Sequence, residues 1–389
     1  MSANDDQDFK TREVHAGVSP DPVTGAILTP IYQTTTYVQE SVDRYLEKGY
    51  SYSRSGNPTV TALENKITAL EGGVGSLCFA TGMAATSCTI IGMVGTGDHI
   101  ILSDVVYGGT HRVSTKVLNR WGLECSFVDT SDAANVKNAI RDNTKLIFTE
   151  TPANPTLKLT DIAAVSAVAR AAGIPHVVDN TFLTPYFQRP LELGADITLH
   201  STTKFMEGHN VSVGGSITAA NQEHLDKIMF VRNCLGSNMS PMVAFYTLQG
   251  VKTMSTRLEA QSANALKVAQ FLETHANVER VCYPGLDSFP QKELADRQAS
   301  GHGSMLWFEV KGGVESGKKL MDRLELWSLA ENLGSVESLV THSVTMTHAD
   351  MPRAERLAAG ITDGLVRLSA GLESATDLIA DLKQALDSL

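Results

Sequence analysis

"DITLHSTTKFMEGHN", residues 196–210, joins a short apolar run to a polar stretch that contains one lysine, Lys204. Three hydroxyl side chains, those of Ser201, Thr202 and Thr203, come directly before this lysine. An isolated lysine at the edge of a sheet is usually a solvated charge. Hydroxyl groups next to a lysine can, however, bind a phosphate group while the amine forms a Schiff base. The stretch therefore predicts an anion site beside a reactive amine.

Similar apolar runs alternate with helical patterns on the N-terminal side of this stretch. The runs "HIILSDVVY" (99–107), "LECSFVDT" (123–130), "TKLIFTETP" (144–152) and "IPHVVDNT" (174–181) are separated by segments such as "DIAAVSAVARAAG" (161–173). This alternation predicts an α/β fold with a mostly parallel sheet covered by helices on both faces. Polar residues end three of the runs, and ligands bind at the carboxyl ends of strands in such sheets.

Three parts of the chain differ in pattern. Residues 1–56 are rich in Pro, Thr, Tyr and Gly without a sustained helical or strand period, which predicts an extended arm. Residues 57–248 carry the alternating pattern and form the expected large domain. Residues 249–389 contain a long helical region, the strand-like "GSMLWFEVKGG" and a closing amphipathic helix, which predicts a smaller C-terminal α+β domain.

Composition and charge restrict the class of partner. The 389 residues have a net charge of −11, which argues against binding to nucleic acid or to an anionic membrane surface. The longest apolar window is interrupted by Gly, Ser and Thr, and the acidic N-terminus does not resemble a signal peptide. Five scattered cysteines predict neither a disulfide framework nor a zinc site. We expect a cytoplasmic protein that binds a small molecule.

The sequence does not support two other kinds of site. "GMVGTGDH" (92–99) contains three glycines, but their order differs from that of a dinucleotide-binding loop and no ribose-binding acid follows at the required distance. The eleven histidines form no pattern typical of a catalytic metal, so no metal is expected. Neither a dehydrogenase nor a metalloenzyme is favoured.

The lysine stretch resembles the pyridoxal phosphate attachment motif of the Cys/Met metabolism enzymes. These include cystathionine γ-lyases, γ-synthases and β-lyases and methionine γ-lyases. The resemblance extends over nearly the whole chain through "YSYSRSGNPT" (50–59), "ALEGG" (69–73), "ATGMAA" (80–85), "YGGT" (107–110), "ETPANP" (150–155), "VVDNTFLTP" (177–185) and "LVRLSAGLE" (365–373). It implies the aspartate-aminotransferase-like fold (fold type I), with a mostly parallel seven-stranded sheet in the large domain, and pyridoxal 5'-phosphate as the cofactor.

The resemblance assigns most cofactor contacts to this one chain. Lys204 is expected to hold the cofactor as a Schiff base and to move protons, and Asp179 to pair with the pyridine nitrogen. Tyr107 is expected to stack on the ring and to serve as an acid toward the leaving group. The phosphate is expected at the start of a helix, where it would contact the backbone of Gly82 and Met83 and the hydroxyls of Ser201 and Thr203.

Other positions are assigned to the substrate. Arg367 is expected to bind the α-carboxylate through two parallel hydrogen bonds, with Asn154 nearby. The loop at 328–352 resembles the γ-synthase and γ-lyase loop, so the acidic positions Glu331 and Glu337 would suit the distal ammonium group of cystathionine. The chain has Asn332 where serine is usual. Arg112 matches an arginine that many synthases use for an acyl carboxylate.

Tyr52 and Arg54 resemble the pair that reaches into the phosphate site of a neighbouring subunit. The resemblance therefore implies a shared site and a homotetramer built as a dimer of dimers, with amino acids as the small-molecule substrates.

Four functional hypotheses remain open. We expect a PLP-dependent carbon–sulfur lyase or γ-replacement transferase, and cystathionine γ-lyase is favoured because Ser55 follows Arg54 as in many γ-lyases. The alternatives are a cystathionine γ-synthase and a γ-lyase with a different leaving group. Methionine γ-lyases typically carry a cysteine where this chain has Gly109. A non-catalytic descendant of the fold is disfavoured because every expected cofactor residue is present.

Overall fold

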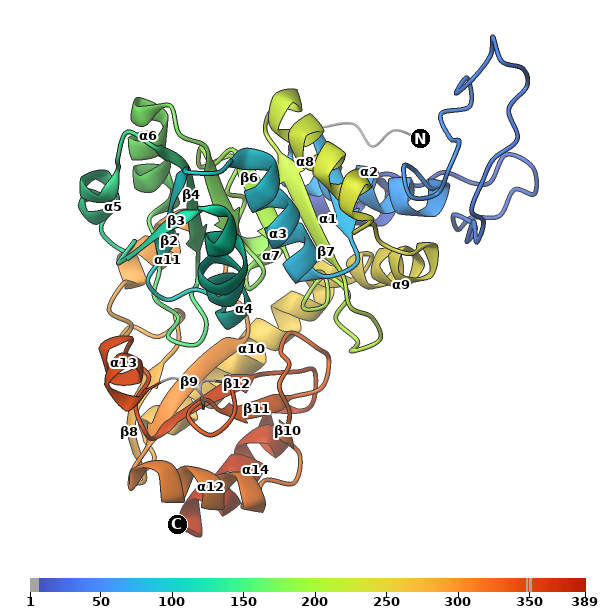
Figure 1. Cartoon of the computed structure of the whole chain (residues 1–389). Coiled ribbons are helices and arrows are strands. Elements are labelled where there is room, and N and C mark those ends of the chain that lie inside the picture. Colours follow the sequence, from blue (N-terminus) through green and yellow to red (C-terminus); the bar gives the residue numbers. More distant parts are fainter. Residues whose placement is uncertain (1–6, 348, 350–351) are drawn as a thin grey trace.

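The computed structural model describes residues 7–347, 349 and 352–389. The first six residues of the predicted arm and residues 348, 350 and 351 of the 328–352 loop lie outside the described residues. The described chain forms two sheets with their helices, one above the other in Figure 1.

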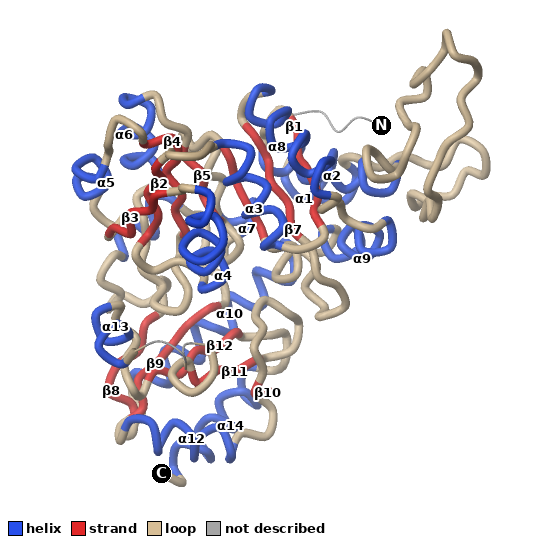
Figure 2. The backbone as a smooth tube through the Cα atoms, viewed as in Figure 1, coloured by secondary structure: helices blue, strands red, loops and turns tan. Residues whose placement is uncertain are grey.

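The first sheet has seven strands in the order β1-β7-β6-β5-β4-β2-β3. All pair in parallel except β7, which runs antiparallel to β1 and β6. The predicted mostly parallel seven-stranded sheet is confirmed, and Figure 2 shows its strands in red. The strands are β1 (Gly75–Phe79), β2 (His99–Ser103), β3 (Glu124–Val128), β4 (Thr144–Glu150), β5 (His176–Asp179), β6 (Ile197–His200) and β7 (Gly215–Ala219).

The strands are buried on both sides, as expected for a sheet covered by helices. Leu146 and Phe148 of β4 pack with α3 and α8, whereas Ile147 between them packs with α5 and α6. Asp179 and Glu150 continue the alternation on the α3 side, at the carboxyl ends of neighbouring strands. That side and that end of the sheet carry the candidate site.

Nine helices belong to the described part of the chain up to residue 251. They are α1 (Phe9–His15), α2 (Pro58–Glu71), α3 (Gly82–Met93), α4 (Gly108–Arg112), α5 (Ala133–Ala139), α6 (Ile162–Ala172), α7 (Thr184–Phe187), α8 (Gln222–Leu235) and α9 (Pro241–Val251). A π-helical turn and a 3-10 turn, residues 113–117 and 118–121, follow α4. Helix α2 ends at Gly72, which adopts a left-handed conformation with φ 76°.

The second sheet has five strands in the order β10-β11-β12-β9-β8 and is mostly antiparallel. Helix α10 contacts β8, β9 and α14, so it covers this sheet while its first turns reach the large domain (Figure 1). The elements are β8 (Val278–Cys282), β9 (Met305–Val310), β10 (Ser328–Leu329), β11 (Leu339–His342), β12 (Leu365–Ser369), α10 (Met254–Glu273), α11 (Lys292–Gln298), α12 (Gly313–Arg323), α13 (Arg353–Ala358) and α14 (Ala375–Asp387).

The predicted arm contains a helix that the sequence pattern did not predict. Helix α1 is held by tertiary contacts, because Lys66 donates to the carbonyls of Glu13 and Val14 at 2.6 and 3.1 Å. The carboxylate of Glu13 in turn accepts the backbone N–H of Ser255 at 2.6 Å. Residues 17–57, in contrast, form the long dark-blue loop that leaves the body of the molecule in Figure 1.

The division at residues 56, 248 and 389 stays a prediction, and its second boundary falls inside α9. None of the helices formed by the described residues combines the length and the apolar composition needed to cross a bilayer.

Candidate active site

A cavity of about 320 Å³ lies at the carboxyl ends of β4, β5 and β6. Its walls come from the start of α3, from the loops after these strands and from the second sheet. Twelve of the residues predicted for the site line it: Gly82, Met83, Tyr107, Arg112, Asn154, Asp179, Ser201, Thr203, Lys204, Glu331, Asn332 and Arg367. Positions far apart in the sequence are thus brought together as expected.

Three predicted residues do not line this cavity. Tyr52 is 46% exposed in the arm, and the guanidinium of Arg54 donates to the backbone and side-chain oxygens of Asn233 at 2.7 and 2.9 Å. Glu337 does not line the cavity, and its carboxylate accepts a hydrogen bond from the side chain of Asn210 at 2.8 Å. Within one chain, therefore, the arm pair and Glu337 stand outside the cavity.

The amine of Lys204 projects into the cavity, where it donates to the side-chain oxygen of Asn332. Burial, together with the positive charge of Arg367, lowers the pKa of Lys204 to about 8. A substantial fraction of this amine is neutral near pH 8, which suits a nucleophile and a proton carrier.

Asp179 faces the cavity from the end of β5. Its Oδ1 accepts the hydroxyl of Thr181 at 2.6 Å and the backbone N–H of Thr181 at 3.1 Å. Burial raises the pKa of this carboxyl, and the two hydrogen bonds oppose the shift. The same hydroxyl of Thr181 accepts the backbone N–H of Ser201 at 2.9 Å. Thr181 therefore joins the ends of β5 and β6, a role that sequence reasoning missed although the residue stands in the quoted "VVDNTFLTP".

The start of α3 forms a second wall. The hydroxyl of Thr81 caps the helix by accepting the N–H of Ala84 at 2.9 Å. A Cβ on Gly82 would lie 2.9 Å from the Cβ of Ser201, so only glycine allows this approach. Free N–H groups at a helix start, together with the Ser201 hydroxyl, make an anion site. The hydroxyl of Thr203 is engaged with Gly214, donating to its carbonyl at 3.1 Å.

Arg367 projects from β12 and is 5% exposed. Its guanidinium donates to the side-chain oxygen of Asn154 at 2.9 Å, to the carbonyl of Asn332 at 3.0 Å and to the hydroxyl of Thr341 at 3.0 Å. Burial lowers the pKa of Arg367 to about 10, and Glu331 opposes the shift. No carboxylate is among these three acceptors, so the charge can still pair with an anionic ligand.

Glu150 is the main site residue that the prediction left out. It is 6% exposed and lines the cavity at the end of β4, in register with Asp179. Its two oxygens accept the backbone N–H groups of Tyr107 and Asn154 at 2.7 and 2.9 Å. The signal was present, because Glu150 ends one of the predicted strands and opens the quoted "ETPANP".

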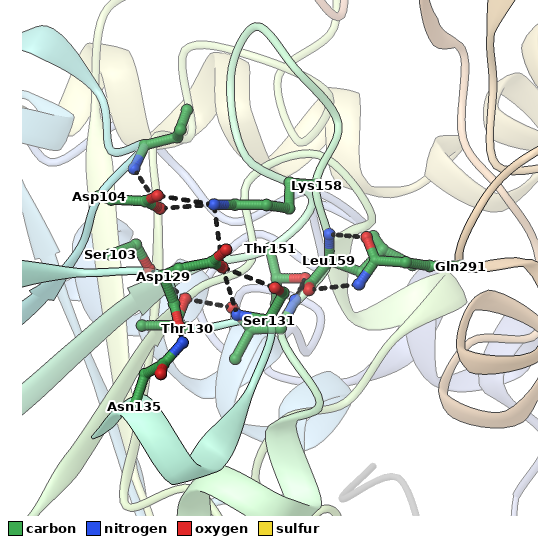
Figure 3. Close-up of polar contacts among 12 residues, drawn as sticks. Ser103, Asp104, Asp129, Thr130, Ser131, Asn135, Thr151, Lys158, Leu159 and Gln291 are labelled. Carbon is green, nitrogen blue, oxygen red and sulfur yellow. Dashed lines mark hydrogen bonds and ion pairs between the residues drawn. The ribbon is translucent and has the colours of Figure 1, made fainter. Parts of the chain in front are cut away.

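The loops after β2 and β4 are also joined by polar contacts of residues that do not line the cavity (Figure 3). Lys158 lies between Asp104 and Asp129 and forms ion pairs of 2.7 and 3.0 Å with them. Gln291 pairs with the backbone of Leu159 through two hydrogen bonds of 2.8 Å. Figure 3 shows these contacts joining the loops after β2, β3 and β4 to the C-terminal part of the chain.

Comparison with known proteins assigns the family. The model of the Cys/Met metabolism PLP-dependent enzymes matches residues 10–387. The chain belongs to this family. It is 47% identical over 380 residues to a cystathionine gamma-lyase of Bacillus subtilis (strain 168), covering 98% of this chain and 99% of that protein.

Two further relatives carry other names. A cystathionine beta-lyase of Coxiella burnetii is 45% identical, covering 99% of this chain and the whole of that protein. The crystal structure of metB from Corynebacterium glutamicum superposes with a TM-score of 0.95 at 43% identity, covering 98% of each chain. The predicted fold type I and the predicted PLP dependence are confirmed, and the chain is a transsulfuration-type carbon–sulfur lyase family member.

The residues present suit the cofactor of the Cys/Met metabolism PLP-dependent enzymes. A lysine with a lowered pKa, a carboxylate at the end of the neighbouring strand β5 and a helix start lined with N–H groups face the same cavity. These groups match the aldehyde, the pyridine nitrogen and the phosphate of pyridoxal phosphate.

Proposed function

We propose that this enzyme cleaves the Cγ–S bond of cystathionine and so produces cysteine, 2-oxobutanoate and ammonia. One observation carries the proposal: the cavity offers the buried Arg367 for an α-carboxylate and the exposed Glu331 at its rim. Cystathionine has an amino-acid group at each end, so a rim carboxylate beside a buried arginine suits its second, distal ammonium group.

Each residue is given a role by its position. Arg367, oriented by Asn154, would bind the α-carboxylate and so fix the substrate relative to the Lys204 amine. The neutral form of Lys204 would accept the proton from Cα and return protons during the later steps. Bound pyridoxal phosphate supplies the electron sink that stabilises the negative charge at Cα. Asp179 would hold the proton on the pyridine nitrogen, and the Tyr107 hydroxyl would donate to the departing sulfur.

Cystathionine γ-synthase activity is the second candidate. It is favoured by Arg112, which lines the cavity as expected for an arginine that binds an acyl carboxylate. The two reactions share their steps up to loss of the γ-substituent, and then differ in whether a proton or a thiol adds.

A methionine-type γ-lyase is less well supported. A Cβ on Gly109 would lie 2.5 Å from the ring of Tyr107 and 2.6 Å from the sulfur of Met83. The cysteine that methionine γ-lyases typically carry here would require the tyrosine ring to move. This chain lacks that cysteine and has no room for it at position 109, which favours a substrate other than methionine.

The test uses the purified, cofactor-loaded protein with cystathionine as the substrate. We expect 2-oxobutanoate and cysteine in equal amounts, whereas cleavage at Cβ would give pyruvate and homocysteine. A second assay with an acylated homoserine and cysteine measures cystathionine formation. A higher kcat/KM in the second assay would replace the lyase proposal by the synthase, and pyruvate as the main product would contradict both.

A further inference from the structure

Glu150 occupies an unusual position for a carboxylate. It is the last residue of β4 and almost fully buried, and its register partner on β5 is Asp179, so two acidic side chains lie next to each other on one face of the sheet. Burial and the negative charge of Asp179 raise the pKa of Glu150 to about 8. A buried acidic side chain beside a second one is a candidate for a functional role.

The hydrogen bonds of Glu150 identify that role. One oxygen accepts the N–H of Tyr107 at 2.7 Å and the other accepts the N–H of Asn154 at 2.9 Å. Both bonds favour the ionised form, which offers two acceptor oxygens. A single side chain thereby fixes the distance between the loop after β2 and the loop after β4.

These two loops carry opposite parts of the site. Tyr107 stands at the start of α4, where no side chain caps the helix, so the hydrogen bond that its N–H donates to Glu150 fixes its backbone. Asn154 orients the guanidinium of Arg367. Tyr107, and Arg367 through Asn154, thus both depend on Glu150 for their position.

We propose that Glu150 is a positioning residue that sets Tyr107 against the cofactor ring and, through Asn154, sets Arg367 against the substrate carboxylate. This inference rests on the proposed use of the cavity as an amino-acid site, but on no particular leaving group. The ion pairs of Lys158 hold the same loops from outside, so the folded core is expected to survive a change at Glu150.

The test is Glu150→Gln in the cofactor-loaded enzyme. The amide keeps one acceptor oxygen and turns an NH2 group toward the other backbone N–H, so one loop loses its support and is repelled. We expect a changed visible circular dichroism band of the bound cofactor and roughly 10-fold weaker binding of L-alanine in a spectral titration. We also expect kcat/KM for cystathionine to fall roughly 10- to 100-fold. L-Alanine has no γ-substituent, so its binding tests Glu150 even if cystathionine is not the substrate.

The matched control is Glu124→Gln on β3, because Glu124 is half-exposed and pairs with Arg141 away from the cavity. It should leave the dichroism and the L-alanine affinity unchanged. If Glu150→Gln does not fold, Glu150→Asp replaces it. The aspartate keeps two acceptor oxygens on a shorter stem, and we expect smaller changes in the same direction. A folded variant of Glu150 with wild-type dichroism and wild-type L-alanine affinity would overturn the proposal.

Discussion

At the scale of single residues, Lys204 combines reactivity with burial. Its lowered pKa, about 8, predicts how pyridoxal phosphate attaches to the cofactor-free protein. Below that pH the amine is protonated and cannot attack the aldehyde, and above it the amine is free. The attachment rate, followed by visible absorbance, should rise through about pH 8 and level off, whereas an ordinary lysine would reach its plateau above its usual value of 10.5. Lys204→Ala should show no attachment. A labelled lysine elsewhere after borohydride reduction would contradict the assignment.

Asp179 is expected to support catalysis while it lowers the stability of the cofactor-free fold. Because burial raises its pKa, its charge weakens the cofactor-free fold at neutral pH, and this cost grows as pH rises through the folded pKa. Asp179→Asn should therefore leave the melting temperature of the cofactor-free protein equal or higher. The same variant should bind cofactor more weakly and turn over roughly 100-fold more slowly or worse, because the proton on the pyridine nitrogen is no longer held. Wild-type turnover with a full complement of cofactor would remove Asp179 from the site.

Residues with chemically distinctive neighbours could be predicted from the sequence, and their supports could not. Lys204 stands after three hydroxyl residues, and Asp179 ends an apolar run. Thr181 and Glu150 bind backbone groups of other loops. Thr181 accepts the N–H of Ser201, 20 residues away, and Glu150 accepts the N–H of Tyr107, 43 residues away. The sequence shows that Glu150 ends a strand, but it does not show which distant loop its carboxylate contacts.

At the scale of elements, the site depends on how closely α3 approaches β7. Gly215 begins β7, and a Cβ there would lie 2.4 Å from the carbonyl oxygen of Thr81 and 2.8 Å from the Cα of Gly82. Both are backbone atoms at the start of α3, so an added methyl group must displace the helix end that is proposed to bind phosphate.

Gly215→Ala should consequently destabilise the fold by about 1–3 kcal/mol and weaken cofactor binding. Denaturant unfolding and a titration of the cofactor-free protein with pyridoxal phosphate measure the two effects. Gly95→Ala, just beyond the other end of α3, is the control, since its Cβ would meet nothing closer than an Asp98 oxygen at 3.5 Å. Equal cofactor affinity in the two variants would show that the helix start does not bind the phosphate.

The elements that were not predicted from the sequence were missed for one physical reason. Strands β1 and β7 begin with glycine, and α1 is stabilised by Lys66 and Ser255 from distant segments. In contrast, β2 to β6 and α14 lie in segments with clear apolar patterns and were predicted. Tertiary contacts, which the pattern of one segment does not contain, decide the remaining elements.

At the scale of the whole molecule, the arm has exposed features that contacts within one chain do not account for. It exposes large apolar side chains, including Val38 and Val42 at 91% and 92%. Contiguous exposed apolar residues are typical of surfaces that contact another protein. Tyr52 and Arg54 lie on this arm outside the cavity of their own chain. These features support, as a proposal, a site completed by a second copy of the chain in a dimer of dimers.

Mixing two inactive variants tests this assembly. If Arg54 serves the partner's cavity, a dimer of one Arg54→Ala chain and one Lys204→Ala chain contains one site with both changes and one site with neither. Activity should return toward half of the wild-type value per mixed dimer, and each variant alone should stay inactive. Lys48→Ala, which removes an exposed arm cation paired with Glu40, is the control and should be active without mixing. Subunit exchange is verified by mass spectrometry with one isotope-labelled variant. Proven exchange without recovered activity would mean that Arg54 acts within its own chain, because both changes would then have to fall in different sites of every mixed dimer.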